Sequence, residues 1–99
     1  MFIHVVLFWC KSGTSNEAKQ AMIDYAHKQM PAIPSVRHVW AGKAVASARD
    51  VVDSSYDIGL CVVFDDQAGH DQYQPHPVHE KFVQLFKSHW DRVRVFDYK

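Results

Sequence analysis

The stretch Phe2–Cys10 constrains the fold more than any other part of this chain. It is rich in valine, phenylalanine and other strand-forming residues, and Ser12-Gly13 follows it as a turn signal. Successive side chains of a strand point to opposite faces, which divides this segment into two sets. The sets are Phe2, His4, Val6 and Phe8 on one face and Ile3, Val5, Leu7 and Trp9 on the other. Because both sets are largely apolar, we expect a central strand that is covered on both faces.

A helix is predicted directly after this strand. Thr14-Ser15-Asn16-Glu17 has the spacing of a capping box, in which Thr14 accepts from the third helical N–H and Glu17 reaches back. Apolar residues then recur at intervals of three and four as far as Met30, and Pro31 and Pro34 stop the helix.

The remaining elements follow from periodicity, turn residues and capping residues. They are a strand Val36–Val45, a polar connection 46–55, a strand Tyr56–Phe64, a short helix capped by Asp65-Asp66 and running through Tyr73, a long helix from Pro77 to near Asp91, and a strand Arg92–Tyr98. This order repeats a split βαβ unit once. It predicts a single α+β domain over residues 1–99, with a ferredoxin-like, four-stranded antiparallel sheet and helices on one face.

The second face of that sheet also needs a cover. Trp9, Trp40 and the alternating valines supply more apolar strand surface than one layer of helices can bury, and large exposed apolar patches usually mark association. We therefore expect a homodimer in which two sheets pack against each other.

Composition narrows the classes of function. The chain has 99 residues, of which 47% are hydrophobic, and this suffices for one core. Its net charge is zero, with 11 basic and 11 acidic residues, so a face for nucleic acid is not expected.

Phe2–Cys10 is too short for a membrane span and lacks the basic flank of an export signal. Cys10 and Cys61 have no zinc-type spacing, and we expect buried free thiols in a cytoplasmic protein.

The segment Tyr73-Gln74-Pro75-His76-Pro77-Val78-His79 contains the candidate functional residues. Pro77 suits the first turn of a helix, because its φ is preset and its missing N–H would have no partner there. At about 100° per residue, His79 falls inside the broad apolar arc of the helix that follows. We therefore expect His79 to face the interior, where an imidazole with a reference pKa of about 6.5 suits proton transfer near neutrality.

Three interpretations of Tyr73 and His79 remain open from the sequence. In the first, His79 is a general base and the Tyr73 hydroxyl stabilises an enolate oxygen. In the second, the two residues bind a ligand without turnover. In the third, His79 donates to a backbone carbonyl while Tyr73 covers one end of the core. His4 joins them in the pocket if its side of the strand is the one that faces the helices.

Residue spacing favours neither a metal site nor a cofactor. His70, His76 and His79 are close in sequence, but His76 precedes the helix and no third ligand of obvious geometry lies nearby. No carboxylate cluster points clearly to a hard cation such as magnesium. The four glycines form no phosphate-binding loop, and packing explains the aromatic residues better than a cofactor slot does. We therefore predict no cofactor and no metal ligands.

Four segments together carry a family resemblance. They are His4-Val5-Val6-Leu7-Phe8, Tyr56-Asp57-Ile58-Gly59-Leu60, His76-Pro77-Val78-His79 and Val95-Phe96-Asp97-Tyr98. In these segments the chain resembles the stress-responsive dimeric α/β barrel (Dabb) family, and the resemblance extends over nearly its whole length. It implies a ferredoxin-like fold and a dimer whose two sheets pack into a barrel.

Within that family, the segment from Tyr73 through His79 and on to Ser88, Trp90 and Phe96-Asp97-Tyr98 resembles olivetolic acid cyclase, a plant polyketide cyclase. The resemblance implies that His79 is a base, that Tyr73 assists it and that His4 also belongs to the site. The helical residues that form the cyclase's alkyl pocket are replaced here by others, so its substrate does not transfer.

These observations lead to a ranked set of functions. The first is a small-molecule-binding protein with an apolar or phenolic ligand. The alternative is an enzyme of the polyketide-cyclase or isomerase type that acts on a carbonyl compound. A homodimer with a purely structural role is the third.

Overall fold

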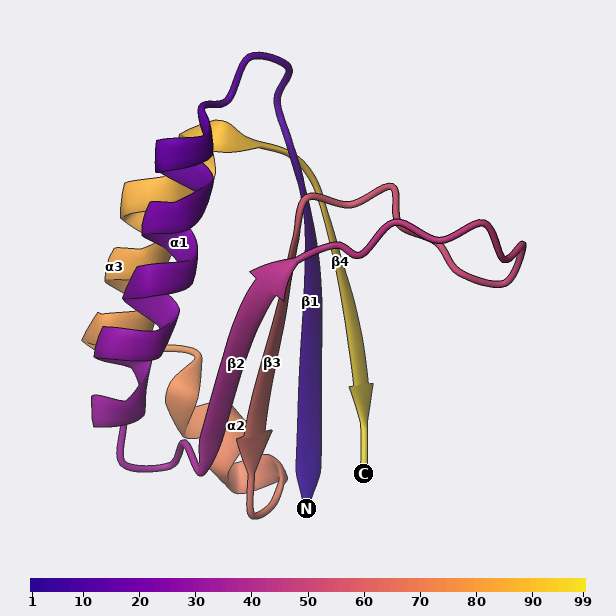
Figure 1. Ribbon diagram of the computed structural model, residues 1–99. Helices are drawn as coiled ribbons and strands as arrows, with labels where there is room; N and C mark the ends of the chain where they lie inside the picture. Colours follow the sequence, from indigo (N-terminus) through magenta and orange to yellow (C-terminus); the bar gives the residue numbers. More distant parts are fainter.

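The computed structural model describes residues 1–99 as one antiparallel sheet with helices on a single face (Figure 1). The elements in chain order are β1 (Phe2–Cys10), α1 (Asn16–Gln29), β2 (His38–Lys43), β3 (Ile58–Phe64), α2 (Gln67–Tyr73), α3 (Pro77–Phe86) and β4 (Trp90–Tyr98), with 3-10 turns at Met30–Ala32 and Lys87–His89. The strand order is β2-β3-β1-β4. The predicted ferredoxin-like fold is therefore confirmed, with β1 inside the sheet and β4 at its edge.

The helix-facing side of the sheet forms the core. Phe2, His4, Val6 and Phe8 are buried on β1, and every second residue of β3 from Ile58 to Phe64 is buried beside them. Helix α1 adds Met22, Ile23 and Ala26, and α3 adds Phe82 and Phe86. The predicted alternation of β1 is correct, and it places His4 among the buried residues on the helix side.

The start of α1 differs from the prediction by one residue. Ser15, not Thr14, is the N-cap, and its hydroxyl accepts a 3.1 Å hydrogen bond from the N–H of Ala18. The Thr14 hydroxyl instead donates to the carbonyl of Lys11 at 2.7 Å. Either hydroxyl suits a cap chemically, and the turn at residues 11–14 decides which one reaches the helix.

Several element ends also differ from those predicted. Helix α3 ends at Phe86, and β4 begins at Trp90, because a 3-10 turn at Lys87–His89 bends the chain back to the sheet. The N–H of Lys11 donates to the carbonyl of His89 at 2.8 Å and ties this turn to the end of β1. The strands β2 and β3 are shorter than expected, since the connection from 44 to 57 leaves the sheet and projects away from it (Figure 1).

The second face of the sheet carries no helix (Figure 1). The register places mostly apolar side chains on it, namely Ile3, Val5, Leu7, Trp9, Trp40, Cys61, Val63, Phe96 and Tyr98. Trp40 is 66% exposed and Tyr98 is 62% exposed. The chain thus has the uncovered apolar sheet face that the sequence predicted.

The structure also bears on the two cysteines and on membrane-spanning segments. Cys10 and Cys61 are free thiols, although each is half-buried rather than fully buried. None of the helices combines the length and the apolar character that crossing a membrane requires.

Candidate functional site

A cavity of about 150 Å³ lies between the sheet and helices α2 and α3. Its lining is mostly apolar and consists of His4, Val6, Phe8, Leu60, Tyr73, Gln74, His79, Phe82, Val83, Trp90, Val93 and Val95. The three predicted site residues, His4, Tyr73 and His79, all line this one cavity. A larger surface depression of about 620 Å³ beside it is open to solvent and lined mainly by polar and charged side chains. The smaller cavity is less open and mostly apolar, and it is the better candidate for a ligand site.

The entrance of α3 positions His79. Pro77 is the first residue of the helix, as predicted, and His76 is its N-cap. The His76 ring accepts a 3.1 Å hydrogen bond from the N–H of Val78 through Nδ1. This bond commits His76 to capping, while His79, one turn further on, lines the cavity.

The hydrogen bond of His79 determines its tautomer. Its Nδ1 lies 2.8 Å from the carbonyl oxygen of Gln74. A carbonyl can only accept, so Nδ1 carries the proton and Nε2 carries the lone pair. Nε2 makes no hydrogen bond within the chain. Burial lowers the pKa of His79, and the bond to Gln74 opposes this only in part. The side chain is therefore a neutral imidazole with an unused basic nitrogen.

Tyr73 lies directly against His79. Their ring centroids are 4.4 Å apart, and Tyr73 is only 1% exposed. Its hydroxyl has no hydrogen-bond partner within the chain. Burial raises the pKa of Tyr73, so the phenol stays protonated and can donate a hydrogen bond to a ligand oxygen.

His4 approaches the same site from the sheet. Its ring centroid lies 5.8 Å from that of Tyr73. Its Nδ1 is 2.6 Å from Oδ1 of Asp97, the residue directly opposite on β4. Burial lowers the pKa of His4, and the hydrogen bond and charge of Asp97 work against that shift. The carboxylate thereby orients a buried imidazole beside the cavity.

Sequence reasoning missed three polar groups around this site. Asp97 was not predicted to pair with His4, because that contact requires the β1–β4 register. His70 was considered only together with its neighbours in sequence, yet its ring lies 4.9 Å from that of His4. Trp90 lines the cavity, and its indole Nε1 is buried without a partner. An unpartnered buried donor is costly, so this N–H is a further group that a ligand could satisfy.

The geometry combines features of the interpretations that the sequence left open. His79 does donate to a backbone carbonyl, as the structural interpretation required. That bond uses only one ring nitrogen, and the other remains unbonded beside an apolar cavity. A structural role for Nδ1 is therefore compatible with a chemical role for Nε2.

Comparison with known proteins identifies the family. The profile of the stress responsive A/B barrel domain, Dabb, matches residues 2–99. The chain belongs to this family. No curated protein matches it in sequence.

Three solved structures show how widely this Dabb fold is shared. The Arabidopsis thaliana protein At3g17210 is 26% identical, with a TM-score of 0.86 over 100% of this chain and 94% of that chain. A dimeric ferredoxin-like protein of unknown function from Thermobifida fusca is 20% identical, with a TM-score of 0.81 over 98% and 88%. The hydroxynitrile lyase from Passiflora edulis is 16% identical, with a TM-score of 0.83 over 98% and 90%. The last two similarities establish the fold, and fold alone does not establish a reaction.

Proposed function

We propose that this Dabb protein binds a small, mostly apolar molecule with a carbonyl oxygen in the cavity between α3 and the sheet. One observation carries the proposal: the rings of His79, whose Nε2 is unbonded, and of Tyr73, whose hydroxyl has no partner, line one mostly apolar cavity with their centroids 4.4 Å apart. An acceptor and a donor set into an apolar lining orient a ligand by its polar end.

The size of the cavity restricts the ligand. A volume of about 150 Å³ is smaller than the roughly 300–1,000 Å³ of sites for drug-sized molecules. The wall formed by β4 is incomplete, because Val93 and Val95 line the cavity and are 40% and 50% exposed. The proposed ligand is therefore a compact molecule, with any longer apolar tail leaving past β4.

A second proposed function is proton transfer by His79, and the tautomer of its ring favours it. In this reaction Nε2 takes a proton from the carbon next to the carbonyl. The C–H electron pair becomes a carbon–carbon double bond, and the carbonyl electrons move onto oxygen as an enolate. Tyr73 donates its O–H to that oxygen, and His4 supports the polar end of the site. Ring closure or isomerisation can follow from such an enolate.

We also propose that the functional unit is a homodimer formed through the uncovered sheet face. Two observations support this assembly: the face is mostly apolar, and the structurally similar Thermobifida fusca protein is described as dimeric. A second copy of the same apolar face is a self-complementary cover, as a two-fold dimer requires.

The test uses a panel of β-dicarbonyl and phenolic compounds. NMR spectra of the wild-type protein are recorded with each compound, and product formation is followed for those that bind. His79→Ala should abolish any turnover, whereas in a protein that only binds it should change affinity alone. His89→Gln is the matched control, since His89 does not line the cavity. If no compound shifts the His79 ring signals, the ligand proposal is wrong for these chemical classes. If compounds bind but are never converted, the proton-transfer proposal is wrong and the binding proposal stands.

A further inference from the structure

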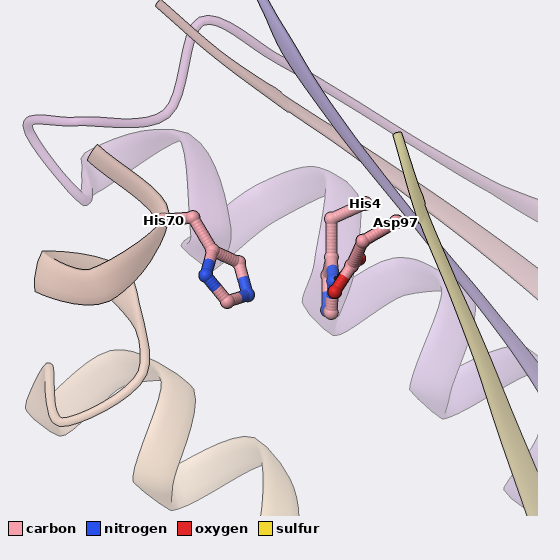
Figure 2. A group of neighbouring side chains, drawn as sticks. All are labelled: His4, His70 and Asp97. Atoms are coloured by element: carbon pink, nitrogen blue, oxygen red, sulfur yellow. Dashed lines mark hydrogen bonds and ion pairs between the residues drawn. The ribbon is translucent and has the colours of Figure 1, made fainter. Parts of the chain in front are cut away.

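Beside the His79–Tyr73 pair, three side chains of the types that bind metal ions lie close together. His4 comes from β1, Asp97 from β4 and His70 from α2, so the fold brings together groups that are far apart in sequence (Figure 2). One ligand atom from each of the three lies within 4.8 Å of the others. We propose that His4, His70 and Asp97 form a binding site for a divalent transition metal of the zinc class.

The distances suit a metal site after small movements. Zinc binds histidine nitrogen and carboxylate oxygen at about 2.0–2.2 Å, so donor atoms in a tetrahedral site lie roughly 3.3 Å apart. The His4–Asp97 pair is closer than this, at 2.6 Å, because a proton now joins the two groups. The full span of the cluster is wider, at up to 4.8 Å. An ion would replace the proton, widen the pair slightly and draw His70 inward by up to about 1.5 Å.

The ring of His70 is already oriented for this role. Figure 2 shows one of its ring nitrogens turned towards His4 and Asp97. The ring stacks on Phe2 with a centroid distance of 4.7 Å and an interplanar angle of 24°. Its Nδ1 lies 3.3 Å from Oδ1 of Asp71, which holds the proton on that nitrogen and leaves Nε2 as the ligand. A carboxylate behind a metal-bound histidine is a common supporting arrangement.

One existing contact must break when an ion enters. The amide nitrogen of Gln74 lies 3.1 Å from Nε2 of His70. Gln74 is exposed, so its amide can turn to solvent at little cost. His4, by contrast, is only 4% exposed and is held by its strand, which keeps one ligand fixed.

The donor set decides which ions fit. Two imidazoles and one carboxylate suit zinc, cobalt, nickel or copper, whereas magnesium and calcium prefer oxygen ligands. Three protein ligands leave a fourth position for water or a ligand, as in open zinc sites. His4 also lines the cavity, so that position would lie next to the proposed ligand site.

The test measures metal binding directly and needs no substrate. Metal-free protein is titrated with Zn²⁺ by calorimetry and with Co²⁺ by visible absorption. We expect one ion per chain, with affinity reduced by at least about tenfold in Asp97→Asn and in His70→Phe. His70→Phe keeps an aromatic ring on Phe2, and His89→Gln removes a histidine outside the cluster and should leave binding unchanged.

A second measurement covers the case in which a variant does not fold. In NMR spectra of the wild-type protein, Zn²⁺ should shift the ring signals of His4 and His70 together and leave those of His89 in place. Absence of stoichiometric binding, or shifts confined to other histidines, would overturn the metal site. The result is independent of the carbonyl-ligand proposal, because no ligand is present in either titration.

Discussion

At the scale of single residues, the site depends on side chains that have a polar atom without a hydrogen-bond partner in the folded chain. His79 uses Nδ1 to hold its ring and leaves Nε2 unbonded, and Tyr73 is buried while its hydroxyl has no partner within the chain. Trp90 adds an indole N–H that is fully buried without a partner, and such a group costs about 1–3 kcal/mol. A ligand atom that accepts from this N–H recovers that free energy.

Tyr73 allows packing and chemistry to be separated. Tyr73→Phe removes only the unpartnered hydroxyl, so the free energy of unfolding should change by less than about 1 kcal/mol. Binding or turnover of a carbonyl compound should nevertheless fall by about tenfold or more. Tyr73→Ala should cost about 3–5 kcal/mol, because it empties a fully buried site. Urea denaturation and ligand titration of the two variants make the comparison. A large loss of stability in Tyr73→Phe would show that the hydroxyl has a structural partner.

The buried His79 imidazole also predicts a pH dependence of stability. Its pKa is lowered in the folded protein, so between that pKa and about 6.5 the unfolded chain binds the proton more strongly. Its contribution to stability is therefore complete above about pH 6.5 and is lost as the pH falls through the lowered pKa. His79→Gln should flatten this dependence while keeping a donor for the Gln74 carbonyl. Urea denaturation from about pH 5 to pH 8 measures it, and an unchanged slope would contradict the assigned shift.

The residues of the site were predictable to different degrees. Strand parity grouped His4 with Phe2, Val6 and Phe8, and helical periodicity placed His79 on the inward arc. Which face of β1 meets the helices was left open by the sequence, and the structure shows that it is the face of His4. The contacts of His4 with Asp97 and His70 did not follow, because they depend on strand register and on where α2 lies. Such long-range geometry has no local signal in a single sequence.

At the scale of elements, caps and turns decide where each functional side chain lies. The His76 cap and Pro77 start α3 at the register that turns His79 into the cavity. The 3-10 turn at Lys87–His89 ends that helix earlier than the apolar pattern indicated and releases Trp90 into β4. The apolar period continues through this turn because the side chains still face the core, so periodicity alone could not show the change of backbone conformation.

The two hydroxyls before α1 test the observed cap. Ser15→Ala removes the bond to the N–H of Ala18 and should lower the free energy of unfolding by about 1 kcal/mol. Thr14→Ala removes only an exposed bond to the carbonyl of Lys11 and should cost less. Thermal or urea unfolding of the two variants gives the comparison. The reverse order would place the cap at Thr14, where the sequence pattern had predicted it.

At the scale of the whole molecule, the two faces of the sheet differ in what covers them. The helix-facing side contains the core, the cavity and the cluster of His4, His70 and Asp97, whereas the other side is mostly apolar and is uncovered within one chain. This asymmetry was predictable, because β1 is apolar on both faces and the helices are too few to cover both. The sequence pattern indicates that another surface covers the second face, but it does not identify that surface.

Trp40 offers a direct test of the proposed dimer. It is 66% exposed on the uncovered face, so Trp40→Asp should not disturb the core of one chain. In a dimer, the same change places a carboxylate in an apolar interface, and dissociation should increase strongly. Leu85→Asp is the matched control, since Leu85 is 48% exposed but lies on α3. Sedimentation equilibrium of the wild type should give a dimer, Leu85→Asp should retain it, and Trp40→Asp should shift towards monomer. A monomeric wild type would show that the apolar face has another partner, and equal effects of both variants would remove the face-specific argument.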